Sequence, residues 1–173
     1  MLFPSREFLF YFLPLLLAGY YALPFRGRRL LLTVAGYFFY GWWNPKYVLL
    51  LLASTVMDYY FGRTIFRSQS AARRKMFLVL SVIANLGYLG FFKYFMFINH
   101  ALSGAFSLVG AGYSPYLLGL KIVLPIGISF YTFQSMSYII DIYRGTVKPA
   151  SSIAEYACYL AMFPQLIAGP IVR

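Results

Sequence analysis

Long apolar runs, separated by short basic segments, constrain the fold of this chain more than any other feature. One run extends from Phe8 to Phe25, and another, 76–99, carries a single charge, Lys93. Eighteen helical residues span about 27 Å, close to the hydrocarbon thickness of about 30 Å. Only 11% of the residues are charged, against about 25% in typical soluble domains. The sequence therefore predicts an all-α, polytopic transmembrane helical protein.

Basic residues gather between the apolar runs. The net charge is +11, from 15 Lys and Arg against 4 acids. Cytoplasmic loops of membrane proteins carry such an excess, so we expect 24–30, 62–75 and 144–150 on the cytoplasmic side. The segment 100–116 has no Lys, Arg, Asp or Glu, and we expect it outside, together with the N-terminus. The same pattern excludes nucleic acid as a partner, because little polar surface remains to bind it.

The apolar run 30–61 is too long for one span, and Asn44-Pro45 interrupts it. Proline disfavours helix in the residue before it and is tolerated in the first turn of a helix. We therefore expect two short helices, 30–43 and 45–61. Two such helices would form a hairpin that crosses the membrane twice. The basic segments 24–30 and 62–75 on either side of it would then lie on the same side of the membrane.

Three isolated side chains each have a plain interpretation and a sharper one. Asp58 lies close to the basic segment, so we expect an ion pair with Arg63 or another loop arginine; the alternative is a catalytic or proton-carrying carboxyl. His100 has no His, Cys or acid near it in the sequence, and we expect a solvated interfacial side chain. Cys158 is the single cysteine, which excludes an intrachain disulfide, and we expect it to be buried.

The segment LPIGISFYTFQSMSYIIDIYRG, 124–145, carries one polar-aromatic stripe. Its start contains a proline and a glycine that are expected to break or kink the helix. The stripe recurs at three- and four-residue spacing on an otherwise apolar helix. It consists of Gly127, Tyr131, Gln134, Tyr138 and Asp141. Two interpretations stay open: a packing stripe held by hydrogen bonds between helices, or the lining of a channel.

The C-terminal stretch AMFPQLIAGPIVR is almost wholly apolar but contains Pro164, Gly169 and Pro170. We expect a helix over 153–163 that stops before the first proline, because proline removes a backbone donor. Non-helical backbone at membrane depth is tolerated only where protein buries it or where it lines a cavity. Discontinuous helices often border substrate paths in membrane proteins. We therefore expect this stretch to pack at the centre of a larger helical assembly.

These motifs resemble one protein family. FFYGWWNPKY (38–47), LPIGISFYTFQSMSYIIDIYRG (124–145) and FPQLIAGPIVR (163–173) look like the N-terminal part of the membrane-bound O-acyltransferase superfamily, in the same order. The opening MLFPSREFLFYFLPL is also similar to that family. The sequences of these motifs fit the bacterial alginate O-acetylation branch of the superfamily better than they fit the D-alanyl transfer protein of teichoic acid modification.

The resemblance implies a multi-pass enzyme of the bacterial inner membrane, with short, broken and tilted helices around a funnel. Such enzymes bind no cofactor and take an acyl group from a cytoplasmic donor, such as acetyl-CoA or another acyl carrier. The implied acceptor is an exported polysaccharide such as alginate, reached with periplasmic acetyltransferase partner proteins. Membrane lipid surrounds the helices.

The essential histidine of that family lies well downstream of the segment that resembles FPQLIAGPIVR. We therefore expect it beyond Arg173, since His100 does not match it in position or context. Residues 1–173 would then be the N-terminal portion of a longer membrane domain. The resemblance gives a channel-shaping role to the stripe and to four residues of the C-terminal stretch, Pro164, Gln165, Gly169 and Pro170. The alternative function is a non-enzymatic, transporter-like or assembly subunit of a cell-envelope polysaccharide system, which broken helices and a polar stripe fit equally well.

Overall fold

The computed structural model describes residues 5–108, 125, 127–162 and 164–165, and within them every regular element is a helix. The elements are a π-helical turn Phe8–Phe12, α1 Leu13–Ala22, α2 Phe25–Trp43, α3 Pro45–Arg67, α4 Ala71–Leu108, α5 Ile128–Arg144 and α6 Ile153–Leu160. The all-α prediction is confirmed. Among the described residues, one helical stretch, Ala71–Phe95, is long and apolar enough to cross a membrane. The multi-pass arrangement therefore stays a prediction.

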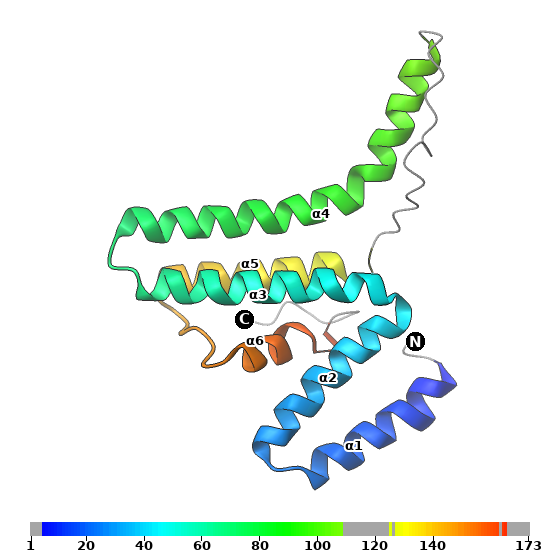
Figure 1. The fold of residues 1–173 in the computed structure, drawn as a ribbon, viewed down its shortest axis with the longest axis vertical. Coiled ribbons are helices and arrows are strands. Elements are labelled where there is room, and N and C mark those ends of the chain that lie inside the picture. The colour runs from blue at the N-terminus through cyan, green and yellow to red at the C-terminus, as the bar shows by residue number, and fades with distance from the viewer. Residues whose placement is uncertain (1–4, 109–124, 126, 163, 166–173) are drawn as a thin grey trace.

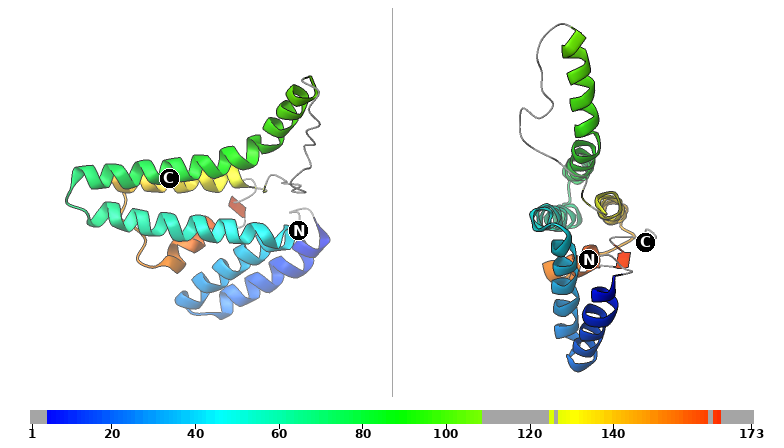
Figure 2. Two further views of the ribbon diagram at one scale, coloured as in Figure 1. Left: turned by 45° about the horizontal axis from the view of Figure 1, so that its top comes forward. Right: turned by 90° about the vertical axis from the view of Figure 1, so that its right-hand side faces the viewer.

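Three helices, α3, α4 and α5, lie side by side (Figure 1) and pack against one another in every pairing. The helices α1 and α2 project from this layer on the side opposite to α4, as the two views in Figure 2 show. The short helix α6 packs against α2, α3 and α5. The second half of α4 bends away from its neighbours (Figure 1). Helices α3, α4, α5 and α6 therefore come together in one region of the structure, which we call their crossing.

The predicted break at Asn44-Pro45 is confirmed. Helix α2 ends at Trp43 and α3 begins at Pro45. Asn44 between them is extended, with φ −158°, as a residue before proline prefers. Its side-chain oxygen accepts a hydrogen bond from the Lys46 N–H at 3.1 Å. This N-cap supplies a partner for one of the donors that the first turn of a helix leaves free.

The first apolar run does not form the single span predicted over Phe8–Phe25. Its helical part ends at Ala22, and Leu23 is extended, with φ −93° and ψ 150°. Pro24 then precedes α2, so the arginines expected in a loop lie in the first turns of that helix. The physical reason is again a proline, which forces the residue before it out of the helical region.

The predicted span 76–99 is confirmed as helix, but the predicted outer segment 100–116 begins too early. Helix α4 continues through Leu108, because residues 100–108 contain no proline that would end a helix. Residues 109–116 lie outside the described part of the chain. His100 belongs to this helix, and its side chain is also outside the described part.

The basic segments around α3, α4 and α5 meet at one end of the bundle. At the start of α4, the Arg74 guanidinium donates a hydrogen bond to the Tyr143 carbonyl at the end of α5, at 2.6 Å. Near the basic start of α2, the Thr33 hydroxyl lies 3.4 Å from the Ala154 carbonyl in the first turn of α6. A shared basic end is what the predicted topology requires.

The last predicted helix is confirmed with a shorter extent. Helix α6 runs from Ile153 to Leu160, and Ser152 caps it by accepting from the Glu155 N–H at 3.2 Å. Its C-terminal turn lies directly against α2, where a Cβ atom on Gly36 would stand 1.9 Å from the Ala161 carbonyl oxygen. Only a glycine lets the two backbones approach this closely.

Candidate functional site at the crossing of four helices

The predicted polar-aromatic stripe lies on α5 and at its start, and two of its residues, Gln134 and Tyr138, contact α6. Gly127 has φ 76° and precedes the helix, so the left-handed conformation sets where α5 begins. Gln134 is 3% exposed and donates to the Tyr159 carbonyl at 3.0 Å. The Tyr138 hydroxyl accepts from the Ala150 N–H at 2.9 Å. These contacts are those of a packing stripe held by hydrogen bonds, which is one of the two predicted interpretations.

Tyr131 faces Tyr40 of α2 inside the main hydrophobic core. Their ring centroids are 6.4 Å apart in an edge-to-face arrangement. Both side chains are almost fully buried, and neither hydroxyl group has a hydrogen-bond partner among the described residues. A buried hydroxyl without a partner costs free energy. This pair is therefore the least satisfied polar point among the described residues of the stripe.

The remaining predicted channel-lining residues lie at the two ends of this region. Asp141 is partly exposed near the end of α5, and its carbonyl accepts from the Thr146 N–H at 3.0 Å. Pro164 is exposed and lines a hollow of about 310 Å³ beside α1 and α2. Gln165 donates its N–H to the Met162 carbonyl at 3.0 Å. The predictions for Gly169 and Pro170 fall outside the described residues.

Asp58 does not sit at an interface beside arginine, as the sequence suggested. Its side chain is fully buried at the crossing of α3, α4 and α5. Arg63 instead donates to the Tyr59 hydroxyl at 2.5 Å and lies over that ring. The predicted ion pair is wrong because one further helical turn separates Asp58 from the basic end and carries it into the bundle.

Hydroxyl and amide groups from three helices surround the Asp58 carboxyl. Ser81 donates to Oδ1 at 2.6 Å, and the Asn85 amide lies 3.1 and 3.0 Å from the two oxygens. Ser135 of α5 donates to Oδ2, and Ser54 approaches the same atom at 3.5 Å. We call these residues, with Tyr156, the Asp58 cluster. Such donors stabilise a carboxylate that has lost its water.

The cluster extends one step further, into α6. The Ser135 hydroxyl shares a 2.8 Å hydrogen bond with the Tyr156 hydroxyl, and the Tyr156 ring stacks on Tyr138 with centroids 4.6 Å apart. A continuous polar path therefore joins α4, α3, α5 and α6. It holds four apolar helices in one register, because a polar group in such a core has no other partner.

Sequence reasoning missed most of the Asp58 cluster, although a signal was present. Ser54 and Asp58 are four residues apart on one helix, and so are Ser81 and Asn85. Pairs at this spacing share a helix face. Two such pairs on otherwise apolar helices indicate that these faces meet.

The groups that acyl transfer would need can be compared with the described residues. Attack by a hydroxyl needs a base to take its proton, and histidine suits this near neutral pH. No histidine side chain lies in the described part of the chain. Within the same part, no group of three His, Cys, Asp or Glu residues is placed to hold a metal ion. What the described residues show is a buried network of polar side chains that links four helices.

Comparisons with known proteins give one consistent result. The whole chain is 45% identical to a protein of Azotobacter vinelandii named "Probable alginate O-acetylase AlgI", and it covers 34% of that protein. It is 44% identical to the Pseudomonas aeruginosa protein of the same name, covering 33% of it. A peptidoglycan O-acetyltransferase of Helicobacter pylori is 34% identical, with 37% covered.

No family model and no solved structure matches the chain. The chain spans about a third of the length of the curated relatives it matches. Within that third the similarity runs along all 173 residues. The resemblance to membrane-bound O-acyltransferases of the alginate O-acetylation branch, which the motifs predict, is therefore confirmed along the length of this chain.

Proposed function

We propose that the protein containing this chain is a membrane-bound O-acyltransferase that O-acetylates an exported polysaccharide such as alginate. The observation that carries this proposal is the 45% identity along the whole chain to a named alginate O-acetylase. The names of these relatives, an alginate O-acetylase and a peptidoglycan O-acetyltransferase, share O-acetylation as the reaction. They differ in the acceptor that they name, alginate or peptidoglycan.

In this proposal the described helices shape the path and do not make or break bonds. The Asp58 cluster fixes α3, α4, α5 and α6 in one register. This crossing positions the predicted channel-lining residues that the structure describes, from Tyr131 to Gln165. The base that deprotonates the acceptor hydroxyl comes from outside residues 1–173. An acyl group from acetyl-CoA or another cytoplasmic carrier crosses the inner membrane along this path to periplasmic acetyltransferase partners.

A chimera tests the proposal. Residues 1–173 replace the similar third of the Azotobacter vinelandii relative, and the chimera is expressed in a strain that lacks its own alginate O-acetylase. We expect acetyl esters on the exported alginate, measured by NMR of the polymer. Residues 1–173 expressed alone should give none, because the described side chains offer no suitable base.

Two controls make the result interpretable. The unmodified relative shows that the strain can acetylate, and immunodetection in the membrane fraction shows that each protein is present. A chimera that inserts stably but leaves the polymer without acetyl groups contradicts the proposed function. Acetylation of peptidoglycan instead of alginate in the same cells would keep the reaction and change the acceptor. Acetylation by residues 1–173 alone would place the base within this chain.

A further inference from the structure

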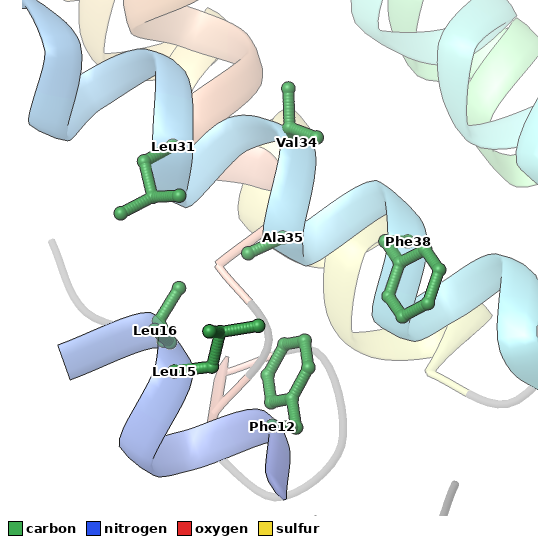
Figure 3. Close-up of a pocket in the computed structure, with 7 residues that line it drawn as sticks. All are labelled: Phe12, Leu15, Leu16, Leu31, Val34, Ala35 and Phe38. Carbon is green, nitrogen blue, oxygen red and sulfur yellow. The ribbon is translucent and has the colours of Figure 1, made fainter. Parts of the chain in front are cut away.

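A groove runs between α1 and α2 on the part of the molecule that projects from the helical layer. Figure 3 shows its walls, formed by apolar side chains such as Leu15 and Leu16 of α1 and Leu31 and Val34 of α2. This part has a volume of about 190 Å³. A second hollow of about 310 Å³ shares Leu31 and Val34 with it and continues toward Gly27. We call the two together the α1–α2 groove.

The length of the groove matches one leaflet of a bilayer. Along α2 its wall extends from Gly27 to Phe38. Eleven helical steps of 1.5 Å correspond to about 16 Å, and half of a hydrocarbon core of about 30 Å is about 15 Å. Val34 and Leu15 are 58% and 77% exposed. Apolar walls this open, in a helix pair that projects from the bundle, suit a single acyl chain.

An exposed positive charge stands at the Gly27 end of this groove. Arg26 precedes Leu30, Val34 and Phe38 at intervals of four residues, so it lies on the same face of α2 as the groove wall. It is exposed, and a long side chain on a helix leans toward the N-terminus. Its guanidinium therefore extends beyond the groove, where a headgroup phosphate would lie.

The other arginines of this turn are already engaged. Arg28 donates from Nε to the Leu23 carbonyl at 2.8 Å and lies over the Tyr20 ring at 5.1 Å. The Arg29 guanidinium lies over the Phe25 ring at 5.2 Å. The first turn of α2 contains no acid that would neutralise Arg26. Basic residues beside a membrane attract the anionic lipids of the cytoplasmic leaflet.

We propose that the α1–α2 groove binds an anionic phospholipid, with one acyl chain along the apolar walls and its phosphate at Arg26. The lipid completes the packing between two helices that otherwise meet mainly through the cluster of Phe8, Leu16, Ala35 and Phe39. This site is separate from the proposed acetyl transfer, and neither depends on the other.

Photo-crosslinking tests the site in the whole protein that contains this chain. The protein is placed in phosphatidylethanolamine nanodiscs that contain either phosphatidylglycerol or phosphatidylcholine, each with a diazirine on one acyl chain. Cross-linked peptides are identified by mass spectrometry. We expect labelling of the peptides that carry Leu15 and Val34, with phosphatidylglycerol labelling them more strongly than phosphatidylcholine.

Two variants separate the acyl chain from the headgroup. Arg26→Gln should lower phosphatidylglycerol labelling of the groove about fivefold, the effect of one basic residue near an anionic surface, and leave phosphatidylcholine labelling unchanged. Val34→Trp should lower the labelling by both lipids, because the larger side chain fills the groove. The matched controls are Lys148→Gln in an exposed loop and Val56→Trp on the exposed face of α3, and neither should change groove labelling.

Three results would overturn the proposal. The first is groove labelling no stronger than on the Val56 face, which would mean that another part of the protein fills the groove. The second is an Arg26→Gln effect equal to that of Lys148→Gln. The third is a folded Val34→Trp variant, with an unchanged melting temperature, that is labelled as strongly as the parent. If Val34→Trp does not fold, the Arg26 comparison decides alone.

Discussion

Replacing Gly36 by alanine tests the close crossing of α2 and α6. The new Cβ would stand 1.9 Å from the Ala161 carbonyl oxygen, whereas real Cβ contacts stay above 3.0 Å, so α6 has to move by about 1.1 Å. The obstacle is backbone, which cannot rotate out of the way as a side chain does. Overpacking of this kind costs typically about 1–3 kcal/mol. We expect a loss of about 3 kcal/mol, because Ala161 is fully buried.

Gly87→Ala is the matched control, because a Cβ atom there meets nothing within 4 Å. On the open face of α4 this change should stabilise the helix by up to about 1 kcal/mol. Both variants are purified in detergent, and their thermal unfolding is compared with that of the parent. A Gly36→Ala variant as stable as Gly87→Ala would show that the α2–α6 crossing is looser than described. The chimera assay adds a functional readout, since a shifted α6 should also reduce acetylation.

Three further predictions concern buried and capping groups. Asp58→Leu should lower the free energy of unfolding by about 3 kcal/mol, because the buried donors around Asp58 lose their acceptor. Asp58→Asn should cost about 1 kcal/mol, since the Asn85 side-chain oxygen has no partner and can accept a hydrogen bond from the new amide. Equal losses in thermal unfolding would mean that the charge of Asp58 itself is needed. Asn44→Ala should cost about 1 kcal/mol through loss of the α3 N-cap, and an unchanged melting temperature would deny that role. Ser151 donates a hydrogen bond to the Glu155 carboxylate and lowers its pKa below 4.5. A carboxyl with a lowered pKa stabilises the folded state at pH values above its pKa in the unfolded chain, so this stabilisation should fade as the pH falls below about 4.5. The melting temperature of Glu155→Gln should therefore change less than that of the parent as the pH falls below about 4.5.

Local signals in this sequence predict local structure well. The helix break at Asn44 follows from the proline after it, and the start of α5 follows from Gly127. The same rule applied to Pro24 would have ended the first helix at Ala22. Its apolar flanks hid this break, because hydropathy alone does not distinguish one long helix from two short ones.

The Asp58 cluster illustrates what the sequence does not reveal. The partners of Asp58 on other helices, Ser81 and Ser135, are 23 and 77 positions away. A pattern within one helix shows that a carboxyl is unusual but not which side chains surround it. Sequence proximity therefore favours the nearest arginines as partners, whereas tertiary packing brings serines and an asparagine to the carboxyl.

The contact between Gly36 and Ala161 also implies a delay during biosynthesis, between the synthesis of α2 and that of its partner α6. The two residues are 125 positions apart, and chains grow by about 5–20 residues per second, so about 6–25 s pass before the partner of this α2 face exists. During that interval the apolar face of α2 around Gly36 lacks its native partner. The yield of correctly assembled protein should therefore depend on the speed of translation through α3, α4 and α5, and on any insertase that shields α2 until α6 arrives.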